Sequence, residues 1–267
     1  MEQSISKAIE QAEAEYLSAR VCALEHLSGN PYGAHTRKVG QLRGFLVEAT
    51  PSPMLNRICG DPTLAPVDFI ALLDWFAQYR RRPAIPWILP QGNTKDVRGF
   101  GRHKFSKIRG WTHAQLYVRP PRRNVKTTFI EVVDVTADEI ELFADIHADA
   151  FRTPEATRPA NRSSFRQLLS TNRAKGFLAR MEGKPAGIGL VYFASNGVAY
   201  MGTAATVRAK RGQGIHSAII ARRIAAARAH GSEFVAATAI AHSQSRRNLE
   251  RSGLSVSHLQ TLFNITA

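Results

Sequence analysis

The chain has 267 residues, 44% of them hydrophobic and 21% charged, which is the composition of a soluble globular protein rather than a disordered or fibrous one. Its 36 lysine and arginine residues against 21 acidic residues give a net charge of +15, which predicts a nucleic acid or a phosphorylated small molecule as partner, unless the surface is merely basic. No apolar run approaches the roughly 20 residues that span a bilayer, and neither Cys22 nor Cys59 has a Cys/His cluster near it that would indicate a disulfide framework or a zinc site. We therefore expect a cytoplasmic protein that binds no metal and no membrane.

The first 120 residues predict an α-β-α-β-β order. Residues 1–27 carry apolar side chains at helical spacing and lack the basic-then-apolar order of a secretory signal, so they predict an amphipathic helix of the mature protein. Further along, the patterns predict a strand at 44–49, a loop opened by Pro51, a helix at 66–80, a strand at 85–89 and an extended stretch at 112–118.

Basic residues are concentrated between Arg80 and Lys126, a segment that we call the basic belt. Its aromatic residues follow no recognisable RNA-binding motif, so base stacking has no support from the sequence. Two adjacent prolines at 120 and 121 interrupt both helix and strand pairing, which predicts a boundary between one domain at 1–120 and a second at 127–267.

The second half has a clearer pattern, which predicts the order β-α-α-β-β-β-α-β-α-β. Two hairpin turns, each with a glycine, join three of the strands, and Gly231 and Gly253 end two of the helices. The predicted strands are 128–135, 176–181, 184–193, 198–207, 233–240 and 259–265, and the predicted helices are 137–151, 162–171, 214–229 and 243–251.

The junction between the strand at 198–207 and the helix at 214–229 contains a glycine-rich turn. Free amide groups and the positive end of the helix dipole meet at such a helix start, and they suit a pyrophosphate. Gly212 and Gly214 let the backbone approach the phosphates closely, while Lys210 and Arg211 add positive charge. Two other nucleotide motifs, GxxxxGK[ST] and GxGxxG, are absent from the sequence.

Together, the order of elements and the turn Arg211-Gly212-Gln213-Gly214-Ile215-His216 resemble the GNAT acyltransferases, whose hallmark is Arg/Gln-x-x-Gly-x-Gly/Ala at this place. The turn departs from that pattern only at its last position, where His216 stands. The resemblance implies an α/β fold with a mixed central sheet flanked by helices, and an N-acetyltransferase that uses acetyl-CoA as cosubstrate. The cofactor-binding residues that it implies are Thr206, Val207, Arg208, Arg211, Gly212, Gln213, Gly214, Ile215, His216, Ser217 and Ser243.

Catalytic residues are less well defined than the cofactor site. Family members usually have a tyrosine near the thiol, but Leu249 occupies that position here and cannot donate a proton. Ser243, Ser245 or a water would have to replace it, unless the thiolate leaves without help or the serines only cap a helix. Tyr200 and Ser243 are the catalytic candidates. Thr203, Glu131 and Asp149 are further polar residues of this region. No residue is assigned as the general base.

The first half resembles the degenerate N-terminal lobe of bacterial two-part GNAT proteins, on the stretches 45–49 and 51–60; an unrelated α/β cap is the alternative. A small-molecule primary amine is the expected acyl acceptor. The alternative acceptor is an aminoacyl-tRNA or another polyanion bound along the basic belt. The alternative to an enzyme is a non-catalytic acyl-CoA-binding protein. The sequence does not indicate an oligomeric state.

Overall fold

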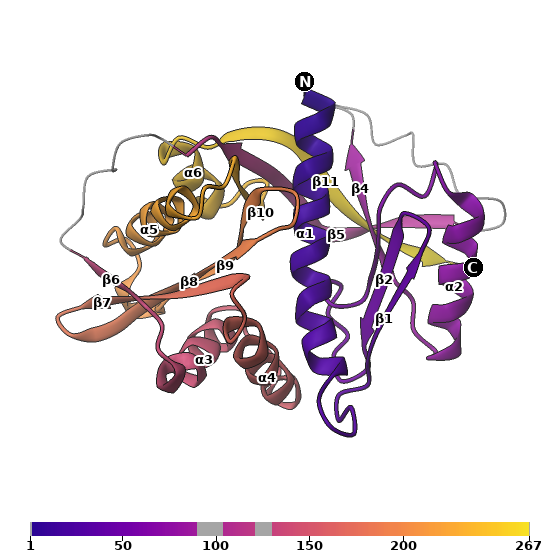
Figure 1. Cartoon of the computed structure of the whole chain (residues 1–267), viewed down its shortest axis with the longest axis horizontal. Helices are drawn as coiled ribbons and strands as arrows, with labels where there is room; N and C mark the ends of the chain where they lie inside the picture. Colours follow the sequence, from indigo (N-terminus) through magenta and orange to yellow (C-terminus); the bar gives the residue numbers. More distant parts are fainter. Residues whose placement is uncertain (1, 90–103, 121–129, 267) are drawn as a thin grey trace.

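The computed structural model describes residues 2–89, 104–120 and 130–266. Within these ranges one sheet of eleven strands runs through the molecule in the order β1-β2-β3-β4-β11-β5-β10-β9-β8-β7-β6 (Figure 1). Most neighbouring strands are antiparallel, whereas β9 with β10 and β3 with β4 are parallel. Helices lie on both faces, so the predicted mixed α/β sheet flanked by helices is confirmed. Among the described helices, none is both long and apolar enough to cross a bilayer.

The first half contains more strands than the sequence predicted. Its two helices lie at the predicted places, but the patterns missed β1 and β3 and gave only the second part of β5. The observed elements are α1 (Glu2–Glu25), β1 (Ala34–Val39), β2 (Leu42–Val47), β3 (Arg57–Cys59), α2 (Pro66–Gln78), β4 (Ala84–Leu89) and β5 (Lys104–Val118).

The second half has the predicted order of elements, with each bound displaced by a few residues at most. The observed elements are β6 (Glu131–Asp134), α3 (Ile140–Ala150), α4 (Arg158–Leu169), β7 (Ala174–Met181), β8 (Lys184–Phe193), β9 (Val198–Thr206), α5 (Ile215–Ala229), β10 (Phe234–Ile240), α6 (Gln244–Arg251) and β11 (Ser255–Thr266).

Strands from the two halves alternate at the centre of the sheet. Strand β5 pairs with β10 on one side and with β11 on the other, and β11 in turn pairs with β4. The predicted division into 1–120 and 127–267 stays a prediction, since residues 121–129 lie outside the described ranges. Three hydrogen-bonded strand pairs nevertheless join the two halves, namely β4 with β11, β11 with β5 and β5 with β10.

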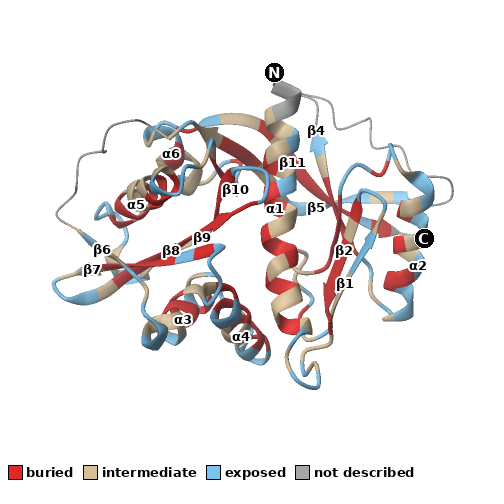
Figure 2. Cartoon of the chain, in the orientation of Figure 1, coloured by how far each residue is buried: buried red, intermediate tan, exposed pale blue. Residues whose placement is uncertain are grey.

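Two hydrophobic clusters hold helices on opposite faces of the sheet. Tyr16 of α1, Phe143 of α3 and Phe165 of α4 belong to one cluster, whereas Ile220 of α5 and Leu249 of α6 belong to another. Figure 2 shows that burial follows this arrangement, because β8 and β9 are buried along most of their length while Ala34 is the single fully buried residue of β1. Each fully buried aromatic or aliphatic side chain contributes roughly 1.5–3 kcal/mol, so these clusters fix the helices that surround the site.

Candidate functional site

The parallel pair β9 and β10 separates partway along its length. Val198–Met201 pair with Phe234–Ala237, but no pairing continues beyond these residues, although both strands are described to Thr206 and Ile240. Strand β9 also shifts register against β8 between Leu190 and Tyr192, which places a bulge close to the point of separation. We call the resulting gap in pairing the β9–β10 opening. It exposes backbone groups of β9 from about Gly202 onward to a ligand.

The glycine-rich turn lies at the mouth of this opening. Gly212 and Gly214 both have a φ of 82°, a backbone conformation that residues other than glycine rarely adopt. Gly214 directly precedes α5. A Cβ built on Gly212 would meet no atom within 4 Å, so the turn borders open space. The Ala218 amide donates to the Gly214 carbonyl at 3.1 Å. The earlier amides of α5, at residues 215–217, have no helical carbonyl four residues before them and are therefore available to a ligand. This geometry suits a phosphate group.

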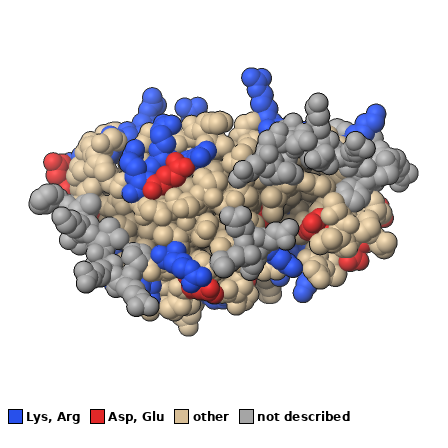
Figure 3. Space-filling model, turned by 90° about the horizontal axis from the view of Figure 1, so that it is seen from above, with Lys and Arg blue, Asp and Glu red and all other residues tan. Residues whose placement is uncertain are grey.

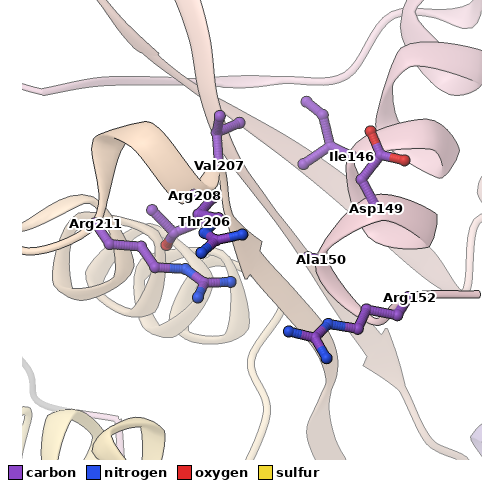
Figure 4. Close-up of a pocket in the computed structure, with 8 residues that line it drawn as sticks. All are labelled: Ile146, Asp149, Ala150, Arg152, Thr206, Val207, Arg208 and Arg211. Carbon is purple, nitrogen blue, oxygen red and sulfur yellow. The ribbon is translucent and has the colours of Figure 1, made fainter.

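A cavity of about 440 Å³ extends from this turn toward α3. One wall comes from the end of β9 and the residues after it, and the other from the end of α3 (Figure 4). Three arginine side chains are directed into the space between the walls, Arg208 and Arg211 from one side and Arg152 from the other. The complete lining consists of Ile146, Asp149, Ala150, Arg152, Thr206, Val207, Arg208 and Arg211.

The α3 side of this cavity was not predicted from the sequence, apart from Asp149. Ile146, Ala150 and Arg152 follow no motif, and they reach the cavity only because α3 packs beside β9. Asp149 forms a salt bridge with the Arg158 side chain at 2.8 Å, so its negative charge is already compensated. Arg152 has a φ of 52°, a conformation that directs the chain sharply away from the end of α3.

The predicted cofactor residues differ in what they offer to a ligand. Thr206, Val207, Arg208 and Arg211 line the cavity. Ile215 is 1% exposed and packs in a small hydrophobic cluster with Ile219, so only its backbone is available. Gly212, Gln213, Gly214, His216 and Ser217 form the turn and the first helical residues beside them.

His216 links the start of α5 to α6. Its Nδ1 atom accepts a hydrogen bond from the Asn248 side-chain amide at 2.9 Å, because an amide nitrogen can only donate. Burial, with a smaller effect of the nearby positive charge of Arg223, lowers the pKa of His216 to about 4. The imidazole is therefore neutral at pH 7 and carries its proton on Nε2.

Both catalytic candidates have structural partners outside the cavity lining. Tyr200 is buried and donates to Glu13 Oε1 at 3.1 Å, and burial together with Glu13 raises its pKa well above the usual value, so it does not act as a base at neutral pH. Ser243 Oγ accepts from the Arg246 amide at 3.2 Å and caps α6. Leu249 is buried in the hydrophobic cluster against α5 and offers no proton. Glu131 lies exposed on β6, and Thr203 is buried on β9.

His147, on α3, should make the fold sensitive to acid. Burial, with a smaller effect of Arg20, lowers its pKa to about 3, against about 6.5 for an unfolded chain. The unfolded state therefore binds a proton that the folded state does not, and stability is lost as pH falls from about 6.5 toward 3, by up to roughly 1.4 kcal/mol per pH unit.

Denaturant unfolding of His147→Gln between pH 7 and pH 4 should show a shallower loss of stability than the parent. His242→Gln provides the control, because His242 is exposed and should leave the slope unchanged. An equal slope in parent and His147→Gln would contradict the assignment. His216 contributes in the same direction and is retained in both variants.

Comparison with known proteins identifies the domain that carries this site. Residues 140–254 match the model of the Acetyltransferase (GNAT) family. A GCN5-related N-acetyltransferase from Kribbella flavida is 17% identical, with a TM-score of 0.61 and 95% of each chain covered. A tandem GNAT protein from the clavulanic acid biosynthesis pathway is 14% identical, with a TM-score of 0.59 over 96% of this chain and 94% of its own.

A putative GNAT acetyltransferase from Novosphingobium aromaticivorans is 18% identical, with a TM-score of 0.57 over 87% of this chain and 92% of its own. No curated protein sequence matches the chain. Identities this low show the fold alone, whereas the family match covers the cavity wall, the β9–β10 opening and the glycine-rich turn. Residues 140–254 therefore match the GNAT acetyltransferase family, within a fold that is similar to that of GNAT proteins over nearly the whole length of the chain.

Proposed function

We propose that the protein is an N-acetyltransferase that transfers the acetyl group of acetyl-CoA to a primary amine of a small molecule. The observation that carries this proposal is the position of the glycine-rich turn at the mouth of the β9–β10 opening. A pyrophosphate at the turn would leave the rest of the cofactor directed along the unpaired edge of β9. From Thr206 back to Gly202 that edge spans about 13 Å, a distance that suits an extended pantetheine arm.

Each part of the site has a separate task in this proposal. The amides at the start of α5 and the Arg208 and Arg211 side chains hold the pyrophosphate, and the unpaired groups of β9 hold the amides of the arm. Bound acetyl-CoA supplies an activated thioester for direct attack by the amine. The protein then contributes mainly by fixing the two reactants in one geometry, which can account for a large part of the acceleration.

A non-catalytic acyl-CoA-binding protein is the second candidate. The observation that favours it is the burial of Leu249, because this position of α6 then provides no tyrosine hydroxyl for protonation of a leaving thiolate. Nucleic-acid binding has less support. On the face seen in Figure 3, lysine and arginine side chains stand in separate groups with acidic side chains beside some of them. Much of the predicted basic belt, residues 90–103 and 121–126, lies outside the described ranges.

The first experiment is thermal unfolding with and without acetyl-CoA, followed by an assay of thiol release with amino acids, polyamines and aromatic amines. Acetyl-CoA at about 100 times its dissociation constant should stabilise the protein by roughly 2.7 kcal/mol. Stabilisation with amine-dependent thiol release supports the transferase, and stabilisation without release from any amine supports the non-catalytic binder. No stabilisation by acetyl-CoA would overturn both.

Arg152 should strengthen cofactor binding from the α3 side. Arg152→Ala removes one cation from the cavity, and the loss of a charge-assisted hydrogen bond worth at least about 1.5 kcal/mol should weaken acetyl-CoA binding roughly tenfold. The exposed side chain should cost the fold little. Calorimetric titration measures the effect, with Arg37→Ala on β1 as a control that removes the same charge from an exposed position outside the cavity lining. Equal affinity in both variants would remove Arg152 from the site.

A further inference from the structure

A polar cluster lies buried beneath α1, on the face of the sheet that α1 covers. At its centre is Glu13, which is 3% exposed. Its Oε1 atom accepts from the Tyr200 hydroxyl at 3.1 Å, and its Oε2 atom accepts from the side-chain amides of Gln115 at 2.9 Å and Gln260 at 2.7 Å. Besides these four residues, the cluster contains Glu10 of α1, Arg57 of β3, Thr238 of β10 and, at its edge, His113 of β5 and His258 of β11.

This polar cluster lies at the apex of the β9–β10 opening. Tyr200 belongs to the last part of β9 that still pairs with β10, opposite Ala236. Thr238 is the first residue of β10 beyond that pairing, and it lies directly opposite Gln115 on β5. Directly opposite residues share one face of a sheet, so Thr238 and Gln115 both face α1. Glu13 thus bonds Tyr200 on β9 and, on the other side of the opening, Gln115 of β5, the strand that pairs with β10.

Two acceptor atoms of the cluster lack a partner. Gln115 Oε1 and Thr238 Oγ1 are both buried without a hydrogen bond, and leaving such an atom unpaired costs about 1–3 kcal/mol. Arg57 Nη1 is also unpaired and lies 3.8 Å from Glu13 Oε1. The amide oxygen of Gln115 and the hydroxyl of Thr238 thus belong to directly opposite residues, Gln115 also bonds Glu13, and each of these oxygens can accept a hydrogen bond from an N–H donor.

The charge of the cluster favours a cation. Among its described members are two carboxylates, Glu10 and Glu13, and one guanidinium, Arg57. The two carboxylates outnumber the one guanidinium, and Glu10 also contacts the His258 ring at 2.7 Å. Burial lowers the pKa of His113, which keeps that ring neutral. The residues beside the apex, Gly202 and Thr238, are partly exposed, so the apex of the opening is partly accessible to solvent next to the buried cluster.

We propose that the polar cluster binds the ammonium group of the acyl acceptor, with Glu13, Gln115 Oε1 and Thr238 Oγ1 accepting its three N–H donors. The inference rests on the proposed function, and it assigns the acceptor class as a small molecule with a primary ammonium group. It also means that the acceptor site is composite, since α1 and β5 come from the first half of the chain. Residues 140–254 alone would lack Glu13 and Gln115.

A titration with simple ammonium salts tests the inference without a known acceptor. Methylammonium chloride has three N–H donors, whereas tetramethylammonium chloride has the same charge and no donor. Two-dimensional NMR of the full chain should show saturable shifts at the Gln115 side-chain amide and the Thr238 backbone amide with methylammonium only. Equal responses to both salts, or no response at these groups, would overturn the proposal.

Thr238→Val is the decisive variant. It removes an unpaired hydroxyl and retains the shape of the side chain, so the fold should keep its stability, whereas Glu13→Gln would leave the buried Arg57 without its partner charge. Methylammonium binding should weaken about tenfold, as expected for the loss of one hydrogen bond to a charged group. Thr112→Val is the control, because the Thr112 hydroxyl bonds Thr261 at 3.0 Å and its side chain lies on the opposite face of β5 from His113. Unchanged binding in Thr238→Val would overturn the proposal.

Acetyl-CoA stabilisation, measured on the same samples, separates this inference from the proposed function. Ammonium binding without acetyl-CoA stabilisation would retain the cation site and remove the transferase. Acetyl-CoA stabilisation without ammonium binding would retain the cofactor site and remove the assignment of Glu13, Gln115 and Thr238.

Discussion

Replacing Gly212 with tryptophan should weaken acetyl-CoA binding at least about 100-fold, equivalent to roughly 2.7 kcal/mol. Gly212 has a φ of 82°, and a Cβ on it points into open space beside the turn. An indole group there would occupy the volume that a pyrophosphate needs and would keep it from the amides at the start of α5. Calorimetric titration of acetyl-CoA into the parent and the variant measures the change.

Gly231→Trp is the matched control for that experiment. Gly231 follows the other end of α5, has a φ of 79° and also has nothing within 4 Å of a built Cβ. Both variants should therefore lose a similar 1–3 kcal/mol of stability from the left-handed backbone. Only Gly212→Trp should lose acetyl-CoA binding, and equal affinities would mean that the turn does not hold the cofactor.

Gly202→Ala should destabilise the fold by about 3 kcal/mol, near the upper end of the usual cost of overpacking a core. A Cβ on Gly202 would lie 2.4 Å from Cζ of Tyr16, and the Tyr16 ring is itself buried between α1 and the sheet. The ring cannot move away freely, because it packs against Tyr192 and Tyr200 at centroid distances of 5.9 and 5.7 Å. Urea unfolding of parent and variant measures the loss.

A double-mutant cycle with Tyr16→Leu identifies the cause. Removing the ring should cost stability in the parent but much less in Gly202→Ala, because the smaller side chain makes room for the methyl group. Additive effects of the two substitutions would show that Gly202 is required for another reason.

Local periodicity was sufficient for most helices and strands but not for the edge of the sheet. Strand β1 contains the polar run His35 to Lys38 and buries only Ala34 fully, so it shows no apolar alternation. Strand β3 has three residues, which is too short for any pattern. The start of β5, from Lys104, is largely exposed and polar, and it forms a strand because β11 pairs with it. Long-range pairing of this kind is not encoded in a sequence window.

The cofactor turn was accessible to sequence analysis because its chemistry lies in consecutive residues. Gly212 and Gly214 signal their backbone conformation directly, and Arg211 stands beside them. Arg152, Glu13 and Gln115 have no comparable signal, since they reach the site through the packing of α3, α1 and β5. Tyr200 is a candidate because of its place on β9, but a sequence does not show that its hydroxyl already has Glu13 as partner.

The position of β11 between β4 and β5 has a consequence for synthesis on the ribosome. The chain emerges from its first residue onward, so β4 and β5 leave the exit tunnel long before β11 exists. Until then each of these strands has an open edge toward the missing neighbour, and such edges favour aggregation. We expect the early segment to depend on chaperones or on rapid completion of translation, and premature stop codons before residue 255 to yield insoluble products.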